Sequence, residues 1–379
     1  MKTASRSELF WNAPYSLESG RAVDPLGFDA LRESMSNVLA PFLTGSTQHA
    51  EHYVAVTVGL RWAKSHARLP IDKEIWPLFA AFERGLKQYW HLYPSNRPAR
   101  RRYLGKRRIA AICSEQRPDV QAPILQDQRG VGLLGNYIES LRAIGLVKKG
   151  QIVINDAAAT LLLGHPRFEW AGTSPGSWDA LHDIFRGVDL RSAWPRVGRR
   201  LFDLDDFSEE RARMNSAARA VRSGAAANWA EIAQSRALLE PQRRMAQATV
   251  PTTELEDQLR ALFTLLLEGG EPTVSRMHVR KLASLAGRIN DLKVIDTVWP
   301  SEPTLAKALR RQIDNAARGR LSARTLLNWH LEIMHARGTD PWLHDLGDHS
   351  ALKLPRERND PDFRLTNMRT LLQETRWAG

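Results

Sequence analysis

The stretch Thr253-Glu-Leu-Glu-Asp-Gln-Leu-Arg-Ala-Leu-Phe-Thr-Leu-Leu-Leu-Glu-Gly269 has the clearest secondary-structure pattern in the chain. Thr253 and Glu256 have the spacing of a capping box, in which each side chain bonds the other residue's backbone N–H at a helix start. Leucine and phenylalanine then recur at helical spacing. Gly269 is typical of a helix end, because glycine tolerates left-handed geometry. The stretch predicts an amphipathic helix that begins at Thr253 and buries one face.

The same pattern recurs on both sides of this helix. Toward the C-terminus it predicts helices over 279–289, over 305–316 with Gly319 as the stop, from Ser322 to Gly338, and after Asp362. Toward the N-terminus it predicts helices over 29–39, from Thr47 to a residue before Pro70, and over 79–89. Between them, residues 169–251 are less regular, with an Ala-rich helical stretch over 209–239. Several amphipathic helices in series indicate helical bundles.

The balance of charges is strongly basic. The 379 residues include 54 Lys and Arg against 42 Asp and Glu, a formal net charge of +12. A hydrophobic content of 43% and twelve tryptophans can build packed cores and argue against a disordered chain. The charge favours a polyanionic partner, with nucleic acid first and an acidic protein surface second.

Much of this charge lies in one run, Arg97-Pro-Ala-Arg-Arg-Arg-Tyr-Leu-Gly-Lys-Arg-Arg108, which has no acid. Trp90 and Tyr93 lie just before the run, and cations interleaved with aromatic rings suit single-stranded nucleic acid. A solvated linker is the alternative interpretation, since Pro98 and Gly105 interrupt the run. The predicted binding residues of the run are Arg97, Arg100, Arg101, Arg102, Tyr103, Lys106, Arg107 and Arg108.

A second candidate begins about twenty residues later, over 132–163. Apolar residues predict a helix that stops at Gly145, followed by a basic turn, a short strand over 151–155 and another helix capped by Asp156. This order resembles winged-helix DNA-binding domains from the recognition helix through the wing. The resemblance implies that the first helix enters the major groove and that the wing contacts the flanking backbone. The outward-facing positions would be Asn136, Glu139, Ser140 and Arg142, with Lys148 and Lys149 on the wing.

These patterns predict a mainly α protein with a helical N-terminal domain, a central winged-helix-like module with a small β-hairpin, and a C-terminal helical bundle. The boundaries expected from the sequence are 1–95, 96–168 for the basic run and the module, 169–251 for a partly helical connection, and 252–379 for the bundle.

Signals for an enzyme are few. The chain has no Walker loop, dinucleotide fingerprint or Gly-x-Ser-x-Gly elbow, and we expect neither a metal nor a cofactor. Arg324 and His330 resemble the catalytic pair of the helical HEPN ribonucleases, which implies proton transfer by His330 and phosphorane stabilisation by Arg324. Thr325 is a weak substitute for the strongly polar residue usual after the arginine, and a chance spacing in an Arg-rich chain is the alternative.

The chain also carries cues about its compartment. Cys113 is the single cysteine and lies among apolar residues, which indicates a buried structural thiol in a reducing compartment. No window approaches the roughly 20 apolar residues that span a bilayer. The segments Asp24-Pro-Leu-Gly-Phe-Asp-Ala-Leu-Arg32 and Pro41-Phe-Leu-Thr44 are followed by Tyr53 and Trp62. Together these residues resemble uncharacterised bacterial proteins of anti-phage defence islands. We therefore expect a cytoplasmic, bacterial protein.

Together these observations predict a non-catalytic nucleic-acid-binding subunit, with DNA expected over RNA, that serves recognition or scaffolding with other protein subunits and without a membrane. A HEPN-like ribonuclease and a scaffold for an acidic protein partner are the alternatives.

Overall fold

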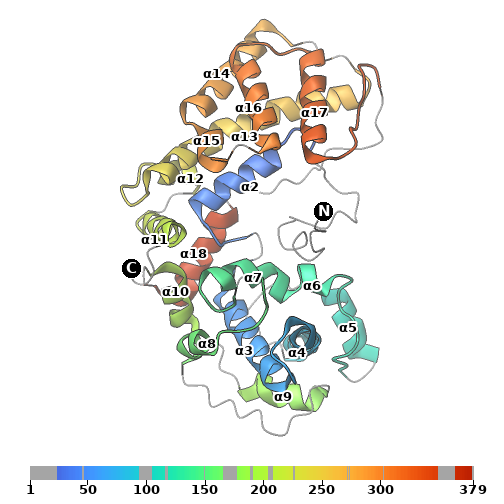
Figure 1. The fold of residues 1–379 in the computed structure, drawn as a ribbon, viewed down its shortest axis with the longest axis vertical. Coiled ribbons are helices and arrows are strands. Elements are labelled where there is room, and N and C mark those ends of the chain that lie inside the picture. The colour runs from blue at the N-terminus through green and yellow to red at the C-terminus, as the bar shows by residue number, and fades with distance from the viewer. Residues whose placement is uncertain are drawn as a thin grey trace. The chain divides into compact units, whose positions relative to one another are not determined.

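The protein is described by a computed structural model. It covers residues 24–44, 47–93, 105–115, 118–148, 150–164, 177–187, 191–203, 208–224, 227–270, 272, 274–301, 303–348 and 363–377. Over these residues the chain is mainly α-helical, as the sequence predicts (Figure 1). It divides into two compact units. Unit 1 comprises residues 1–17, 42–203 and 370–379, and unit 2 comprises residues 18–41 and 204–369.

Both units are built from helices. The helices of unit 1 are α3 (Ala50–His66), α4 (Asp72–Leu92), α5 (Lys106–Glu115), α6 (Gln128–Val131), α7 (Leu133–Ala143), α8 (Asp156–Leu163), α9 (Trp178–Gly187) and α10 (Trp194–Phe202). Those of unit 2 are α2 (Phe28–Leu39), α11 (Glu209–Arg222), α12 (Trp229–Ile232), α13 (Glu240–Leu267), α14 (Arg276–Asp291), α15 (Val294–Val298), α16 (Thr304–Ala317) and α17 (Ala323–Arg337). The last helix, α18 (Phe363–Thr375), begins in unit 2 and ends in unit 1. The boundaries at 95, 168 and 251 expected from the sequence remain predictions.

The core of unit 1 forms where α3 and α4 pack against each other. Gly59 of α3 permits this approach, because a Cβ atom built there would lie 2.5 Å from the ring of Phe82. A buried ion pair follows on α4, where Lys87 Nζ lies 2.6 Å from Glu83 Oε1. The same carboxylate accepts a hydrogen bond from the Leu133 N–H at the start of α7. A carboxylate at this position stabilises α7, because it interacts with the positive end of the helix dipole.

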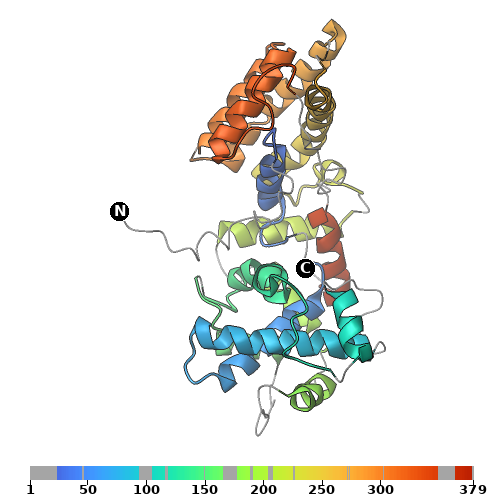
Figure 2. The same ribbon diagram turned by 90° about the vertical axis from the view of Figure 1, so that its right-hand side faces the viewer.

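In unit 2, α13 packs against α2, α14 and α17, and α16 lies between α14 and α17 (Figure 2). The ends of α17 are those predicted. Ser322 accepts a hydrogen bond from the Thr325 N–H, and Gly338 adopts a φ of 66°. The Thr339 N–H then bonds the Met334 carbonyl at 3.0 Å, which completes a Schellman-type end. Predicted helix positions around 29–39, 279–289, 305–316 and after Asp362 are also confirmed.

Two predicted helix starts are wrong. α13 begins at Glu240 rather than Thr253 and continues through Pro251. Side chains on both sides of Pro251, including Met245 and Leu255, are buried, and their burial outweighs the hydrogen bond that proline removes. The long helix α3 begins at Ala50 rather than Thr47, because Glu374 of α18 accepts a hydrogen bond from the Ala50 N–H at 2.8 Å.

Two further predictions differ from the structure. The Ala-rich stretch over 209–239 is not one helix but contains α11 and α12 with a break between them. The strand and hairpin expected over 151–155 are not confirmed. Among the described residues, the β-pairing consists of an isolated antiparallel bridge between Val147 and Ile154. The helix that follows is confirmed, but Asn155 rather than Asp156 caps it.

Candidate nucleic-acid interface

The net charge is distributed unevenly between the two units, because they contain equal numbers of cations and different numbers of acids. Unit 1 contains 27 Lys and Arg against 16 Asp and Glu, whereas unit 2 contains 27 against 26. Unit 1 therefore carries a net charge of +11 and unit 2 a net charge of +1. Because a net positive charge attracts polyanions over long distances, unit 1 is the part of the chain best suited to bind one.

The first turn of α5 carries the described end of the basic run. Lys106, Arg107 and Arg108 are exposed there, and none forms an ion pair with a residue that the structure describes. The next residue, Ile109, is buried against Ile124 and anchors the turn. Cations at the positive end of a helix destabilise the free protein, because they oppose the helix dipole. The same arrangement favours the binding of an anion. The other predicted residues of the run, Arg97, Arg100, Arg101, Arg102 and Tyr103, lie outside the described residues.

The predicted recognition helix α7 is largely buried. Ser140 is fully buried and its hydroxyl donates to the Phe42 carbonyl, so the expectation that it faces outward is wrong. Among the four predicted readers, Glu139 is the exposed one, and it pairs with Arg142 at 2.6 Å. Asn136 is half-buried. The stripe that α7 leaves at the surface is therefore centred on an acid, which repels phosphate.

The turn after α7 adds one described cation. Lys148 is exposed beside the bridge between Val147 and Ile154, whereas Lys149 lies outside the described residues. The Asn155 N–H donates to the Leu146 carbonyl at 2.8 Å and closes the turn. Among its described residues the turn has an isolated bridge and no ladder of strand pairs.

The ribonuclease pair on α17 does not form a site. His330 is fully buried: its Nδ1 donates to the Pro25 carbonyl at 3.1 Å, and its Nε2 accepts from the Trp342 N–H at 2.9 Å. These two bonds require the neutral ring, and burial lowers the pKa of His330 to about 4. Arg324 is exposed and pairs with Asp345 at 2.7 Å. Neither nitrogen of His330 is available to a substrate, so the geometry favours a structural role.

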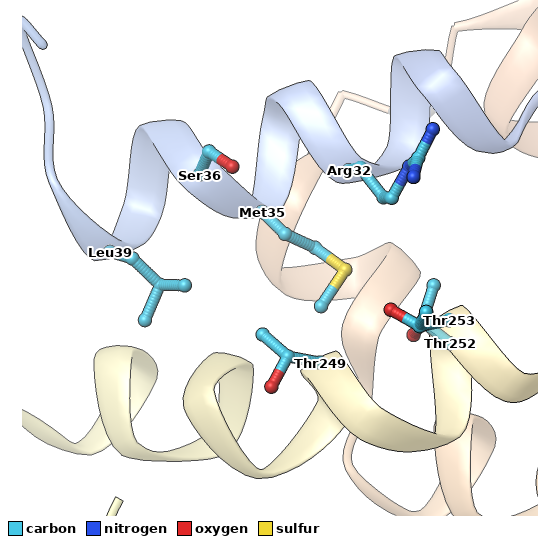
Figure 3. Close-up of a pocket in the computed structure, with 7 residues that line it drawn as sticks. All are labelled: Arg32, Met35, Ser36, Leu39, Thr249, Thr252 and Thr253. Carbon is cyan, nitrogen blue, oxygen red and sulfur yellow. The ribbon is translucent and has the colours of Figure 1, made fainter. Parts of the chain in front are cut away.

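Unit 2 contains a small cavity between α2 and α13 (Figure 3). It is lined by Arg32, Met35, Ser36, Leu39, Thr249, Thr252 and Thr253. Its space suits about one water molecule, whereas a small-molecule site needs roughly 300 Å³ or more. The cavity is therefore not a substrate site.

Ionisable groups are buried in the same unit. Arg32 Nε lies 3.3 Å from Glu256 Oε2, and burial outweighs this partner and raises the pKa of Glu256 to about 7. Burial and the nearby Asp29 raise the pKa of Asp24 to about 6. The raised pKa values of Glu256 and Asp24 lie near neutral pH, but neither carboxylate faces a pocket of ligand size formed by the described residues. We assign them to the stability of unit 2.

Histidines and the single cysteine also have structural partners. His49 Nδ1 lies 2.9 Å from Glu374 Oε1, and His52 Nδ1 lies 3.0 Å from the Tyr137 hydroxyl. Cys113 is half-buried beside Ile109, and burial raises the pKa of its thiol. Among the residues that the structure describes, no group of three or more His, Cys, Asp or Glu side chains is placed to hold a metal ion.

Comparisons with known proteins leave the chain without a family assignment. No protein-family model, no curated protein and no solved structure matches it. Within the described part of the chain, every helix is too short or too polar to cross a lipid bilayer.

The sequence places Tyr93 just before the basic run but does not predict the aromatic cluster that Tyr93 joins at the end of α4. Tyr93 is exposed there, and its ring centroid lies 5.4 Å from that of His182 on α9. The signal for α9 is the helical spacing of Trp178, Leu181, His182 and Phe185, which lie in the partly helical connection expected over 169–251. Trp90, by contrast, is buried against His52 and is not available for stacking.

Proposed function

We propose that unit 1 binds nucleic acid without catalysis, as a recognition or scaffold subunit of a bacterial multi-protein assembly. The observation that carries the proposal is the exposed first turn of α5, where Lys106, Arg107 and Arg108 stand unpaired among the described residues at the positive end of a helix. An arrangement that opposes the helix dipole is costly in the free protein, and a bound phosphate relieves that cost. The net charge of +11 on unit 1 supports the same partner.

The proposal keeps the order of elements from the winged-helix interpretation of 132–163 but not the role of α7 as a recognition helix. The order of α7, a turn with Lys148, an antiparallel bridge and α8 supports it. The burial of α7 argues against insertion of that helix into a groove. We therefore propose that phosphate contacts by α5 and Lys148, rather than base readout by α7, supply most of the affinity. DNA is the expected partner, and a role in anti-phage defence rests on the resemblance of 24–62 alone.

The test is a salt titration of binding. Lys106, Arg107 and Arg108 are replaced by Ala together, and affinity for duplex DNA, single-stranded DNA and RNA is measured over a range of salt concentrations. Each lost phosphate contact should lower the log–log salt slope by roughly 0.7–0.9. The matched control replaces Arg276, Arg280 and Arg318 of unit 2, which are also exposed, and should leave the slope unchanged.

Three results would contradict the proposal or narrow it. Wild-type protein that binds none of the three nucleic acids refutes it outright. An unchanged slope in the α5 variant excludes this turn as the interface. Equal losses in the α5 variant and the unit 2 control would show that total charge, rather than a site on unit 1, determines binding.

A further inference from the structure

The aromatic cluster at the end of α4 joins two helices. Tyr93 follows the last residue of α4, and its ring centroid lies 4.8 Å from that of Tyr89. His182 of α9 lies within 5.6 Å of both tyrosine rings, and Trp178 lies 5.8 Å from His182. Tyr89 is buried, whereas Tyr93 is 40% exposed. The cluster therefore holds Tyr93 in place from within unit 1 and leaves part of it at the surface.

The packing below the cluster fixes its position. Gly85 lets α9 approach α4, because a Cβ atom there would lie 3.0 Å from Leu181 and 3.2 Å from Phe185. The Phe185 ring in turn contacts those of Phe82 and Tyr89. An aromatic side chain held on a rigid support loses little conformational entropy when it binds a ligand. Tyr93 is thus prepared to stack on another flat ring.

The aromatic cluster and the first turn of α5 differ in charge and suit different parts of a ligand. Asp183 lies 3.6 Å from His182 and is exposed, so this surface repels phosphate. The unpaired cations of α5 attract phosphate, and α5 packs against the same helix α4 (Figure 1). Twelve residues of chain separate Tyr93 from Lys106. A ligand with both flat bases and a phosphate backbone matches this combination of surfaces.

We propose that Tyr93, supported by Tyr89 and His182, is a stacking site for an unpaired base, which makes single-stranded nucleic acid the preferred ligand of unit 1. This inference rests on the proposed function. In a duplex the base faces are already stacked on one another, so an aromatic ring at the surface has no base face to contact. Single-strand binding proteins combine aromatic stacking with cations along the backbone for this reason.

The test compares Tyr93→Ala with Tyr93→Phe and Leu92→Ala. Leu92 is the exposed apolar neighbour of Tyr93 and controls for loss of apolar surface. Affinity is measured for labelled oligothymidylate, oligouridylate and a DNA duplex of equal length at one salt concentration. Tyr93→Ala should weaken single-strand binding by roughly 5- to 100-fold, the effect of one stacked base. Duplex binding should be unchanged, and Tyr93→Phe and Leu92→Ala should behave as wild type.

Thermal unfolding of each variant establishes that the fold is intact. Equal weakening of single-strand and duplex binding by Tyr93→Ala, or no weakening at all, overturns the inference. If the α5 variant loses affinity while Tyr93→Ala does not, the proposed function stands and the stacking site falls. If the wild type binds neither single strands nor duplex, both fall. The oligothymidylate and oligouridylate arms show whether the strand is DNA or RNA.

Discussion

Unit 1 and unit 2 contain the same number of cationic side chains and differ in the number of acids that balance them, 16 in unit 1 and 26 in unit 2. In unit 2, Arg310 pairs with Asp296 and Arg311 with Glu332, whereas Arg276 and Arg280 are exposed and form no ion pair with a residue that the structure describes. In unit 1 the cation Lys87 is paired and buried, whereas those of the first turn of α5 are exposed and unpaired among the described residues. A count of charges along the chain does not distinguish these cases. Pairing and burial identify which cations remain for a ligand.

The largest expected effect tests whether Lys87 is structural. Lys87→Met leaves the buried Glu83 carboxylate without its cation, and loss of one partner of a buried pair costs about 3–5 kcal/mol. Urea unfolding should show this loss in the free energy of unfolding. Lys106→Met, which removes an exposed cation, should leave stability nearly unchanged. If Lys87→Met and Lys106→Met had similar free energies of unfolding, the ion pair of Lys87 would not contribute to stability as proposed.

A second effect of about 3 kcal/mol is expected in unit 2 as the pH falls. The pKa of His330 is lowered from 6.5 to about 4, so the unfolded chain binds more protons than the folded chain between these values. The stability that the neutral ring contributes is complete above pH 6.5 and is lost as the pH approaches 4. Urea unfolding across this range measures the loss.

His330→Asn is the control for this pH dependence, since asparagine does not titrate there. The raised pKa values of Asp24 and Glu256 act in the opposite direction, because the folded state takes up protons as the pH falls. The wild type and His330→Asn share that contribution. The difference between their free energies of unfolding at each pH therefore reports on His330 alone. A pH-independent difference would show that the ring is not buried as a neutral group.

The smallest expected effects compare helix packing in the two units. Gly59→Ala in α3 places a methyl group against Phe82 and should destabilise unit 1 by about 1–3 kcal/mol. Gly287→Ala in α14 meets no atom within 4 Å and should stabilise unit 2 by up to about 1 kcal/mol through helix propensity. Differential scanning calorimetry of both variants checks the opposite signs. Two shifts of the same sign would contradict the packing around one of the two glycines.

Local sequence signals predicted much of the helical structure. The two ends of α17 depend on Ser322 and Gly338, whose effects are confined to one turn, and both were predictable. The start of α3 was not, because the group that accepts the Ala50 N–H is Glu374, more than three hundred residues away. The start of α13 was missed because Thr253 and Glu256 have the spacing of a capping box, whereas both lie inside a helix that burial around Pro251 sustains.

The candidate site shows the same limit. The charge of α5 is visible in the sequence, and its exposure at Lys106, Arg107 and Arg108 agrees with a charged run. Ser140 has the spacing of an outward position on α7, yet a carbonyl from residue 42 covers it. The contact between the Tyr93 and His182 rings joins two helices that are distant in the sequence, and no local pattern predicts such a pair.

The contribution of Glu374 to α3 also constrains the order of events during translation. Residues 204–369 of unit 2 are all synthesised before Glu374 leaves the ribosome. A nascent unit 1 must therefore wait, with the positive end of α3 uncompensated, while the whole intervening stretch emerges. The hydrogen bond at the start of α3 can therefore form only after the residues of unit 2 have been synthesised.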